Sequence, residues 1–247
     1  MAETIAQGDF ITIDYVGKVK STGKIFDLTR EDIAKKEGMM SDNARFGPVT
    51  VVVGAKHVLP GLDTHLPGLK VGDKKTFDIS ATDGFGNKDA SLVKLIPRSE
   101  FKKQKVNPMP GMPVNLDNKY GIVQSVSGGR IKVDFNHPLA GKELSYEVEI
   151  HNQIDKPEDQ IRALFRFHLS KVDTKAVEVT ISGKIADIST PKDPRTRRYI
   201  NLTEEIIAGD ILKYIKGVET VKFIDVFEKP KAIKETASAN KKSQSTK

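Results

Sequence analysis

The feature that most constrains the fold is an alternation of apolar and polar residues that recurs along the first 150 residues. Between residues 10 and 20, the apolar residues Ile11, Ile13 and Tyr15 alternate with Thr12 and Asp14. A period of two places one set of side chains on each face of an extended chain, which predicts a half-buried β-strand. Further segments that alternate or are rich in β-branched residues lie at 25–27, 49–53, 74–80 and 144–150.

Two short helices are expected in the same region, at residues 31–37 and 57–66, the second stopped by Pro67-Gly68. The amino-acid composition changes after Gly86, where prolines and lysines become frequent. A hairpin is expected there, with a turn at residues 127–129 and with Tyr120, Ile122 and Val126 on one face. The sequence therefore predicts a first domain that is interrupted by a small β module at residues 88–134.

The hydrophobic period changes after Gln153. The apolar stripe of Ile161, Leu164, Phe165, His168 and Leu169 follows helical spacing, and Asp155 is placed to cap that helix. A strand is expected around residues 177–181. A second helix should contain Ile200, Ile207, Ile211, Tyr214 and Ile215, and a last strand should run over residues 221–227. Residues 153–229 therefore read as a C-terminal α+β unit.

The net charge of +7 owes much to the end of the chain, where residues 231–247 hold five lysines and one glutamate. With a single large apolar residue, this stretch cannot bury enough surface to offset the entropy cost of ordering. Residues 230–247 are expected to be a disordered basic tail that aids solubility or attracts an acidic partner. A trio of arginines, Arg195, Arg197 and Arg198, is expected to be a solvated helix start rather than an RNA site.

Several classes of chemistry are excluded. The chain has no cysteine, which removes disulfides and thiolate catalysis, and its five histidines do not form a short-spacing ligand pair. Motifs for phosphate binding, serine hydrolysis and zinc proteolysis are absent. No apolar run of about 18 residues is present to span a bilayer, and the first 30 residues do not resemble a secretion signal. We expect a cytoplasmic protein without cofactor, metal or membrane contact.

Several segments, in order, resemble the FKBP family of peptidyl-prolyl cis-trans isomerases. They are Tyr15, Phe26-Asp27, Val53-Gly54, 58–62 (VLPGL), 66–73 (LPGLKVGD), 83–86 (DGFG), 136–141 (NHPLAG) and 146–149 (YEVE). The module between Phe85-Gly86 and Asn136-His137 lies where the SlyD-like branch carries its insert-in-flap domain. The segment at 30–47 and the C-terminal unit look like those of the long archaeal FKBPs.

The resemblance implies an α+β fold in which an antiparallel β-sheet wraps on a short helix. An isomerase domain would be formed by residues 1–87 and 135–152, an insert-in-flap chaperone domain by 88–134, and a C-terminal α+β domain by 153–229. The implied function is a peptidyl-prolyl cis-trans isomerase that also binds unfolded chains. Its partners would be unfolded or nascent polypeptides that contain X–Pro bonds.

The resemblance also implies an active site. Four residues are assigned catalytic roles, namely Asp27, Tyr15, Phe85 and Tyr146. Five others would line the proline pocket: Phe26, Val51, Val58, Leu59 and Leu62. The sequence departs from the small human-type FKBPs, because Leu62 replaces the pocket tryptophan and Phe85 lacks the usual hydroxyl. These changes argue against tight macrolide binding. The alternative interpretation is that these residues are only the core of a β-fold.

In the insert, five residues are expected to form an adaptable groove for apolar segments, and the alternative is that they are the insert's own core. They are Met109, Met112, Tyr120, Ile122 and Val126. The last strand carries Phe223 and Phe227 on one face and Ile224 and Val226 on the other, which suggests a homodimer through the C-terminal domain. Two rival functions remain open: a non-catalytic holdase on an FKBP fold, and a ribosome- or RNA-associated factor.

Overall fold

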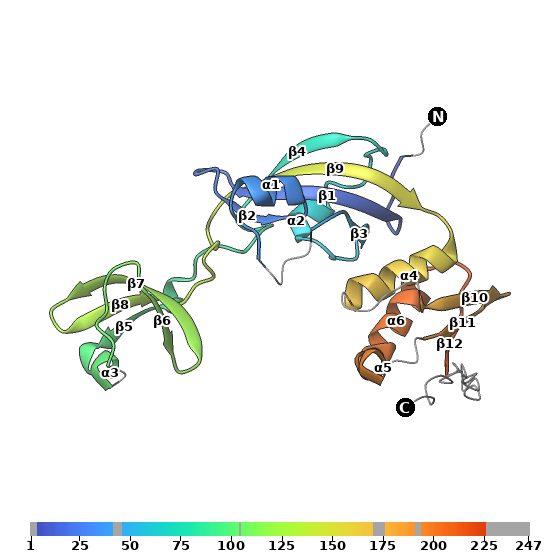
Figure 1. Ribbon diagram of the computed structural model, residues 1–247. Helices are drawn as coiled ribbons and strands as arrows, with labels where there is room; N and C mark the ends of the chain where they lie inside the picture. Colours follow the sequence, from blue (N-terminus) through green and yellow to red (C-terminus); the bar gives the residue numbers. More distant parts are fainter. Residues whose placement is uncertain (1–3, 42–45, 104, 170–175, 191–193, 226–247) are drawn as a thin grey trace, which may run out of the picture.

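A computed structural model describes residues 4–41, 46–103, 105–169, 176–190 and 194–225. Within these residues the strands form three sheets in an α+β fold, as expected. Figure 1 shows the three sheets one after another along an elongated molecule, with the insert at one end and the C-terminal unit at the other. The predicted basic tail, 230–247, lies outside the described residues, as do Val226 and Phe227.

The central sheet is antiparallel and has the order β2-β1-β9-β4, with β3 paired to the free part of β1. Its strands are β1 (Phe10–Val19), β2 (Ile25–Leu28), β3 (Val49–Val52), β4 (Lys74–Ile79) and β9 (Leu144–Ile154). Two short helices accompany it, α1 (Glu31–Lys36) and α2 (Pro60–Asp63). The main core of this unit lies on the sheet face that packs against α2, while α1 packs on Val16 and Leu28 at the other face.

The helix expected at 57–66 is much shorter in the structure. Leu59 is its N-cap residue and Pro60 occupies the first turn, where the fixed φ of proline and its missing N–H are tolerated. Residues 57 and 58 therefore belong to the connection from β3, and the helix ends after Asp63. The predicted helix at 31–37 is confirmed.

The insert is a four-stranded antiparallel sheet in the order β5-β8-β7-β6. It consists of β5 (Val93–Pro97), β6 (Pro113–Leu116), β7 (Lys119–Ser127) and β8 (Arg130–Asp134), with the 3₁₀ turn η1 (Ala90–Leu92) and helix α3 (Arg98–Lys103). A register shift in β7 between Val123 and Ser125 changes which side chains share a face. Val126 therefore packs in the insert's core, and the expectation that it faces the same way as Tyr120 and Ile122 is wrong.

The C-terminal unit combines a mixed sheet with three helices. It contains α4 (Pro157–His168), β10 (Glu178–Ser182), β11 (Ile185–Ser189), α5 (Pro194–Asn201), α6 (Glu204–Tyr214) and β12 (Thr220–Ile224). The central strand β11, which the sequence analysis missed, pairs antiparallel with β10 and parallel with β12. The core of this unit also takes in Phe10 and Val52 from the central sheet.

Two further expectations about this unit are corrected. The predicted second helix is two helices, because the chain breaks at Leu202 and Thr203, where the Thr203 hydroxyl donates to the carbonyls of Tyr199 and Ile200. The helix α4 is preceded by Lys156 rather than capped by Asp155. In the part of the chain that the structure describes, no helix is long and apolar enough to cross a membrane.

Candidate active site

The predicted site residues meet around Tyr146, which lies near the start of β9 and is almost fully buried. Its ring lies 5.7 Å from that of Tyr15 on the neighbouring strand β1 and 5.8 Å from that of Phe26 on β2, both measured between centroids. Phe26 and Tyr146 meet edge to face, the arrangement that the quadrupoles of aromatic rings favour. The three adjacent strands β2, β1 and β9 thus each contribute one ring to the same aromatic cluster.

A close approach of backbone makes this cluster possible. A Cβ atom built on Gly17 would lie 2.9 Å from Cζ of Phe26 and 3.0 Å from the ring of Tyr146. Such distances are shorter than carbon atoms tolerate, so the two rings occupy space that any other residue at position 17 would need. Gly17 was not identified by the sequence analysis, since a glycine inside a strand pattern is a weak signal of close approach.

Phe85 completes the aromatic wall from the loop that follows β4. Its ring meets Phe26 edge to face at 5.8 Å and is stacked on His137, with centroids 4.5 Å apart and planes 10° apart. His137 comes from the loop between β8 and β9, and the sequence analysis did not assign it to the site. The motif that contains it, residues 136–141, was the available signal.

The aliphatic members of the predicted pocket join the same cluster. Val51 and Leu62 are buried in it, whereas Val58 and Leu59 are half-buried against it. Asp63 holds the connection that carries the last two residues, because its carboxylate accepts hydrogen bonds from the backbone N–H of Gly54 (2.8 Å) and of Lys56 (2.9 Å). The structure therefore brings eight of the nine predicted residues into one cluster, with Asp27 exposed at its edge.

Asp27 is tied to the cluster by one hydrogen bond. The Tyr15 hydroxyl donates to Oδ2 of Asp27 at 3.0 Å. Burial, and then the charge and hydrogen bond of Asp27, raise the pKa of Tyr15 well above its usual range. Burial, and then the Asp27 charge, likewise raise the pKa of Tyr146. Both phenols stay protonated at physiological pH, so the site offers hydroxyl donors and apolar walls but no phenolate base.

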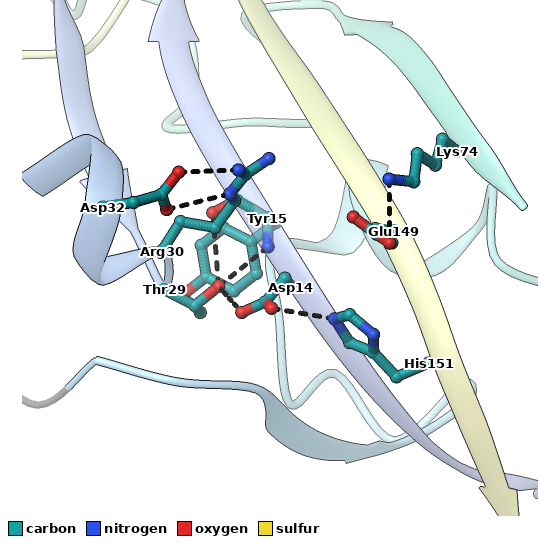
Figure 2. Close-up of polar contacts among 8 residues, drawn as sticks. All are labelled: Asp14, Tyr15, Thr29, Arg30, Asp32, Lys74, Glu149 and His151. Carbon is teal, nitrogen blue, oxygen red and sulfur yellow. Dashed lines mark hydrogen bonds and ion pairs between the residues drawn. The ribbon is translucent and has the colours of Figure 1, made fainter. Parts of the chain in front are cut away.

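A polar network lies behind this site, where the edge of β1 that faces away from β9 has no partner among the described strands between its pairings with β2 and β3 (Figure 2). Thr29 fills the gap. Its backbone N–H donates to the carbonyl of Tyr15 (3.0 Å), and its hydroxyl accepts from the Tyr15 N–H (2.9 Å) and donates to Oδ1 of Asp14 (2.5 Å). Oδ2 of Asp14 accepts from Nε2 of His151 at 2.8 Å.

The same network borders a polar cavity of about 210 Å³ on the sheet face opposite the Tyr15 ring. Most of its charged groups are paired, either with each other or with residues beside the cavity. Arg30 holds Asp32 through two hydrogen bonds, and Lys74 lies 3.0 Å from Glu149 (Figure 2). This cavity is separate from the aromatic cluster and contains none of the predicted pocket residues apart from Tyr15.

The five residues predicted for the insert's groove do not form one surface, because some pack in the core and others are exposed. Met112 and Val126 pack against the insert's core. Met109 and Tyr120 are 61% and 56% exposed, and Ile122 is half-buried on the face opposite the core. Leu95, which the sequence analysis did not single out, is 60% exposed on the same open face as Tyr120 and Ile122. Met112, which packs in the core, therefore does not share a surface with Tyr120.

A hydrogen-bonded cluster lies where the insert joins the central unit. The carboxylate of Asp134 at the end of β8 accepts from Lys88 (2.9 Å), from Gln124 (2.9 Å), and from the backbone and side-chain nitrogens of Asn136 (2.9 and 2.7 Å). Burial alone would raise the pKa of Asp134, but the hydrogen bonds from Lys88 and Asn136 outweigh it and lower the pKa to about 2. The side chain of Asn136 in turn bonds the backbone of Asp89 in both directions.

Comparison with known proteins identifies relatives for most of the chain. A family model described as FKBP26, IF domain, matches residues 94–139, and one described as FKBP26_C-terminal matches residues 157–228. The second range lies within the predicted C-terminal domain, and the first overlaps the predicted insert and runs past its end at residue 134; the domain boundaries stay a prediction.

Among individual proteins, a short-type peptidyl-prolyl cis-trans isomerase of Methanocaldococcus jannaschii is 29% identical over 152 residues, 62% of this chain and 96% of the relative. An FKBP-type 16 kDa peptidyl-prolyl cis-trans isomerase of Escherichia coli is 32% identical over 154 residues, 61% of this chain and 94% of the relative. The FKBP-type peptidyl-prolyl cis-trans isomerase SlyD of Haemophilus influenzae is 29% identical over 124 residues, 48% of this chain and 64% of the relative.

Proposed function

The chain belongs to the FKBP-type peptidyl-prolyl cis-trans isomerases, and from this premise we propose that the aromatic cluster around Tyr146 is its active site and that its insert binds unfolded chains. The protein would accelerate folding steps that wait on an X–Pro bond. Its proposed partners are unfolded or nascent polypeptides, and the proposed location is the cytoplasm.

The chemistry needs no proton transfer. An X–Pro bond isomerises over a barrier of about 18–20 kcal/mol, because amide resonance must be broken in the twisted transition state. The planar amide is more charge-separated than the twisted one. A water-excluding apolar wall therefore destabilises the planar form relative to the transition state.

Each part of the cluster has a role in this proposal. The rings of Phe26, Phe85 and Tyr146 and the side chain of Leu62 form the apolar wall that holds the proline ring. The Tyr15–Asp27 pair provides the polar edge, where the carboxylate orients the phenol and interacts with the twisted amide. Phenols that stay protonated suit a reaction in which the site acts by shape and polarity.

The observation that carries the proposal is the hydrogen bond between Tyr15 and Asp27 at the edge of the aromatic cluster. A β-fold core alone does not require an exposed carboxylate to hold the hydroxyl of a largely buried tyrosine. The holdase alternative requires no such pair.

The test is the catalysed cis-to-trans isomerisation of short X–Pro peptides. Asp27→Ala and Tyr15→Phe each remove the same hydrogen bond, so each should lower kcat/KM about five- to tenfold, and the double variant should lose little more. Tyr146→Ala should lower it further by opening the wall. Matched controls are Asp78→Ala, an exposed aspartate paired with Lys20, and Tyr120→Ala in the insert.

Wild-type catalysis no faster than the uncatalysed reaction would contradict the active-site assignment and favour the holdase. Full activity in Asp27→Ala and Tyr146→Ala would place the site elsewhere in the chain.

For the insert, the supporting observation is the open face of its sheet, where Leu95, Tyr120 and Ile122 lie opposite the core. Exposed apolar side chains of this kind suit the transient binding of unfolded segments. The proposed surface differs from the groove predicted from sequence, because Met112 and Val126 belong to the insert's own core.

A homodimer through the C-terminal domain remains a proposal. Exposed apolar side chains are Tyr199 on α5, Leu202 between the two helices, Ile206 on α6 and Ile224 on β12. Light scattering at micromolar concentration tests it, and a monomer there would rule it out. The RNA alternative finds less support, because Arg197 forms an ion pair with Asp225.

A further inference from the structure

The connection between β3 and α2 touches two units of the molecule at once. Val58 and Leu59 pack against the aromatic cluster of the candidate active site. The residue before them, His57, contacts the C-terminal unit. Its ring is stacked on Phe167 of α4, with centroids 3.9 Å apart and planes 16° apart, and it lies edge-on to Tyr214 of α6 at 6.4 Å.

A hydrogen bond defines the protonation state of His57. Its Nδ1 accepts from the backbone N–H of Val52 at 3.2 Å. A ring nitrogen that accepts cannot carry a proton, so His57 is neutral in this arrangement and its proton lies on Nε2. Val52 belongs to the core of the C-terminal unit, whereas its neighbour Val51 belongs to the core of the candidate active site.

The rest of the connection is held within the first unit. Asp63 fixes the backbone at Gly54 and Lys56, and Lys56 has a φ of 60°, a left-handed conformation that a lysine adopts only when its neighbours enforce it. His57 follows directly. Its ring therefore links two helices of the C-terminal unit to a constrained loop, and this loop continues along the chain into Val58 and Leu59.

We infer that the C-terminal unit acts on the isomerase site through His57. When α4 and α6 are docked, the neutral imidazole bonds Val52 and stacks on Phe167, which holds Val58 and Leu59 against the aromatic cluster. Protonation of His57 removes the acceptor, so acid releases the C-terminal unit and loosens this wall of the pocket. The inference rests on the proposed function of the aromatic cluster.

The charges around His57 set the direction of the pH effect. Burial is the main influence and lowers its pKa below the ordinary value of 6.5. Asp210 of α6 and Asp63 of α2 act in the opposite direction, and His168 of α4 adds to the lowering. Asp210 is partly engaged, since its Oδ2 lies 2.7 Å from Nε2 of His168.

Two more groups face this contact. They are Tyr214 and Lys213, whose ammonium lies 4.7 Å from the centre of the Tyr214 ring. The undocked protein, with a His57 pKa nearer 6.5, binds more protons than the docked protein. Docking is therefore complete above pH 6.5 and weakens as the pH falls below it.

Two variants separate the parts of the contact. His57→Phe keeps a ring to stack on Phe167 but removes the acceptor and the titrating group. His57→Asn keeps an acceptor near the position of Nδ1 but loses the stacked ring. Because the chain has no cysteine, the exposed residues Lys24 and Lys216 can be changed to cysteine and labelled, so that energy transfer between two dyes reports docking in the full chain.

In the wild type, energy transfer should fall between pH 7 and pH 5, and KM for an X–Pro peptide without titrating groups should rise about fivefold while kcat changes little. His57→Phe should show no such acid transition in either readout. His57→Asn should show reduced transfer and a raised KM already at pH 8. His151→Asn, as a histidine control, should retain the acid transition in energy transfer.

An unchanged acid transition in His57→Phe would overturn the assignment to His57. A fall in energy transfer with a constant KM would show that docking of the C-terminal unit does not affect the isomerase site. Failure of the active-site proposal has another signature, because Asp27→Ala would then retain full activity while the dye signal still followed the pH.

Discussion

Gly17 leaves the space in which the rings of Phe26 and Tyr146 meet. Gly17→Ala should lower the free energy of unfolding by about 1–3 kcal/mol, because its Cβ forces both rings to move. It should also lower isomerase activity. The matched control is Gly209→Ala in α6, where a Cβ meets nothing within 4 Å and a helical alanine should raise stability by about 0.5–1 kcal/mol.

Urea denaturation and peptide isomerisation of both variants check this prediction. Wild-type stability and activity in Gly17→Ala would contradict the close packing of the two rings.

A second effect of a single residue is the contribution of the Asp134 charge to folding stability. Its pKa, about 2 instead of 3.8, means that the folded state stabilises the carboxylate. This contribution is complete above about pH 4 and is lost as the pH falls through 2. Asp134→Asn should therefore cost about 2 kcal/mol at pH 7.

The difference between Asp134→Asn and wild type should shrink toward pH 2, as measured by denaturant unfolding. Asp78→Asn, at an exposed ion pair, should cost less than about 1 kcal/mol. A cost for Asp134→Asn that does not change with pH would show that the carboxylate charge is not the cause.

At the scale of elements, β1 depends on Thr29 where it leaves one partner strand for the next. Thr29→Val keeps the shape but removes the hydrogen bonds of the hydroxyl, and leaves the N–H of Tyr15 and the carboxylate of Asp14 without this partner. We expect a loss of about 1–3 kcal/mol in stability and a weaker Tyr15–Asp27 pair.

Amide hydrogen exchange at Tyr15 should accelerate in Thr29→Val, and peptide isomerisation should slow. Thr50→Val is the control, because the Thr50 hydroxyl makes only a 3.4 Å contact with Thr12 on an adjacent strand. Equal effects of the two variants would argue against a special role for Thr29.

At the scale of the whole molecule, the insert lies at the opposite end from the C-terminal unit, with the aromatic cluster in the central unit between them (Figure 1). Replacing residues 88–134 by a short glycine-rich linker should leave catalysis on a tetrapeptide within about threefold. It should slow the refolding of a proline-limited protein much more, because the surface that retains the unfolded chain is gone.

Both rates are measured with the same preparation. Equal losses on the two substrates would refute the division of work between the central unit and the insert. The control is Tyr120→Ala, which should reduce refolding activity in part and leave tetrapeptide turnover intact.

The sequence by itself determined the strands of the central sheet, the insert's position between Phe85 and Asn136, and most residues of the aromatic cluster. These features follow from local periodicity and from motifs whose residues keep their order along the chain. Most side chains of the cluster could be predicted because they lie in short motifs, whereas Val51 lies outside these motifs, in a β-branched run.

Only the tertiary structure decided what depends on distant segments meeting. The bulge in β7 moved Val126 into the insert's core, and the parallel pairing of β11 with β12 has no local signature. Likewise, Gly17, His137 and the stacking of His57 on Phe167 have their meaning through contacts across the fold. Periodicity reports which face of an element is apolar, and it carries no information about which other element covers that face.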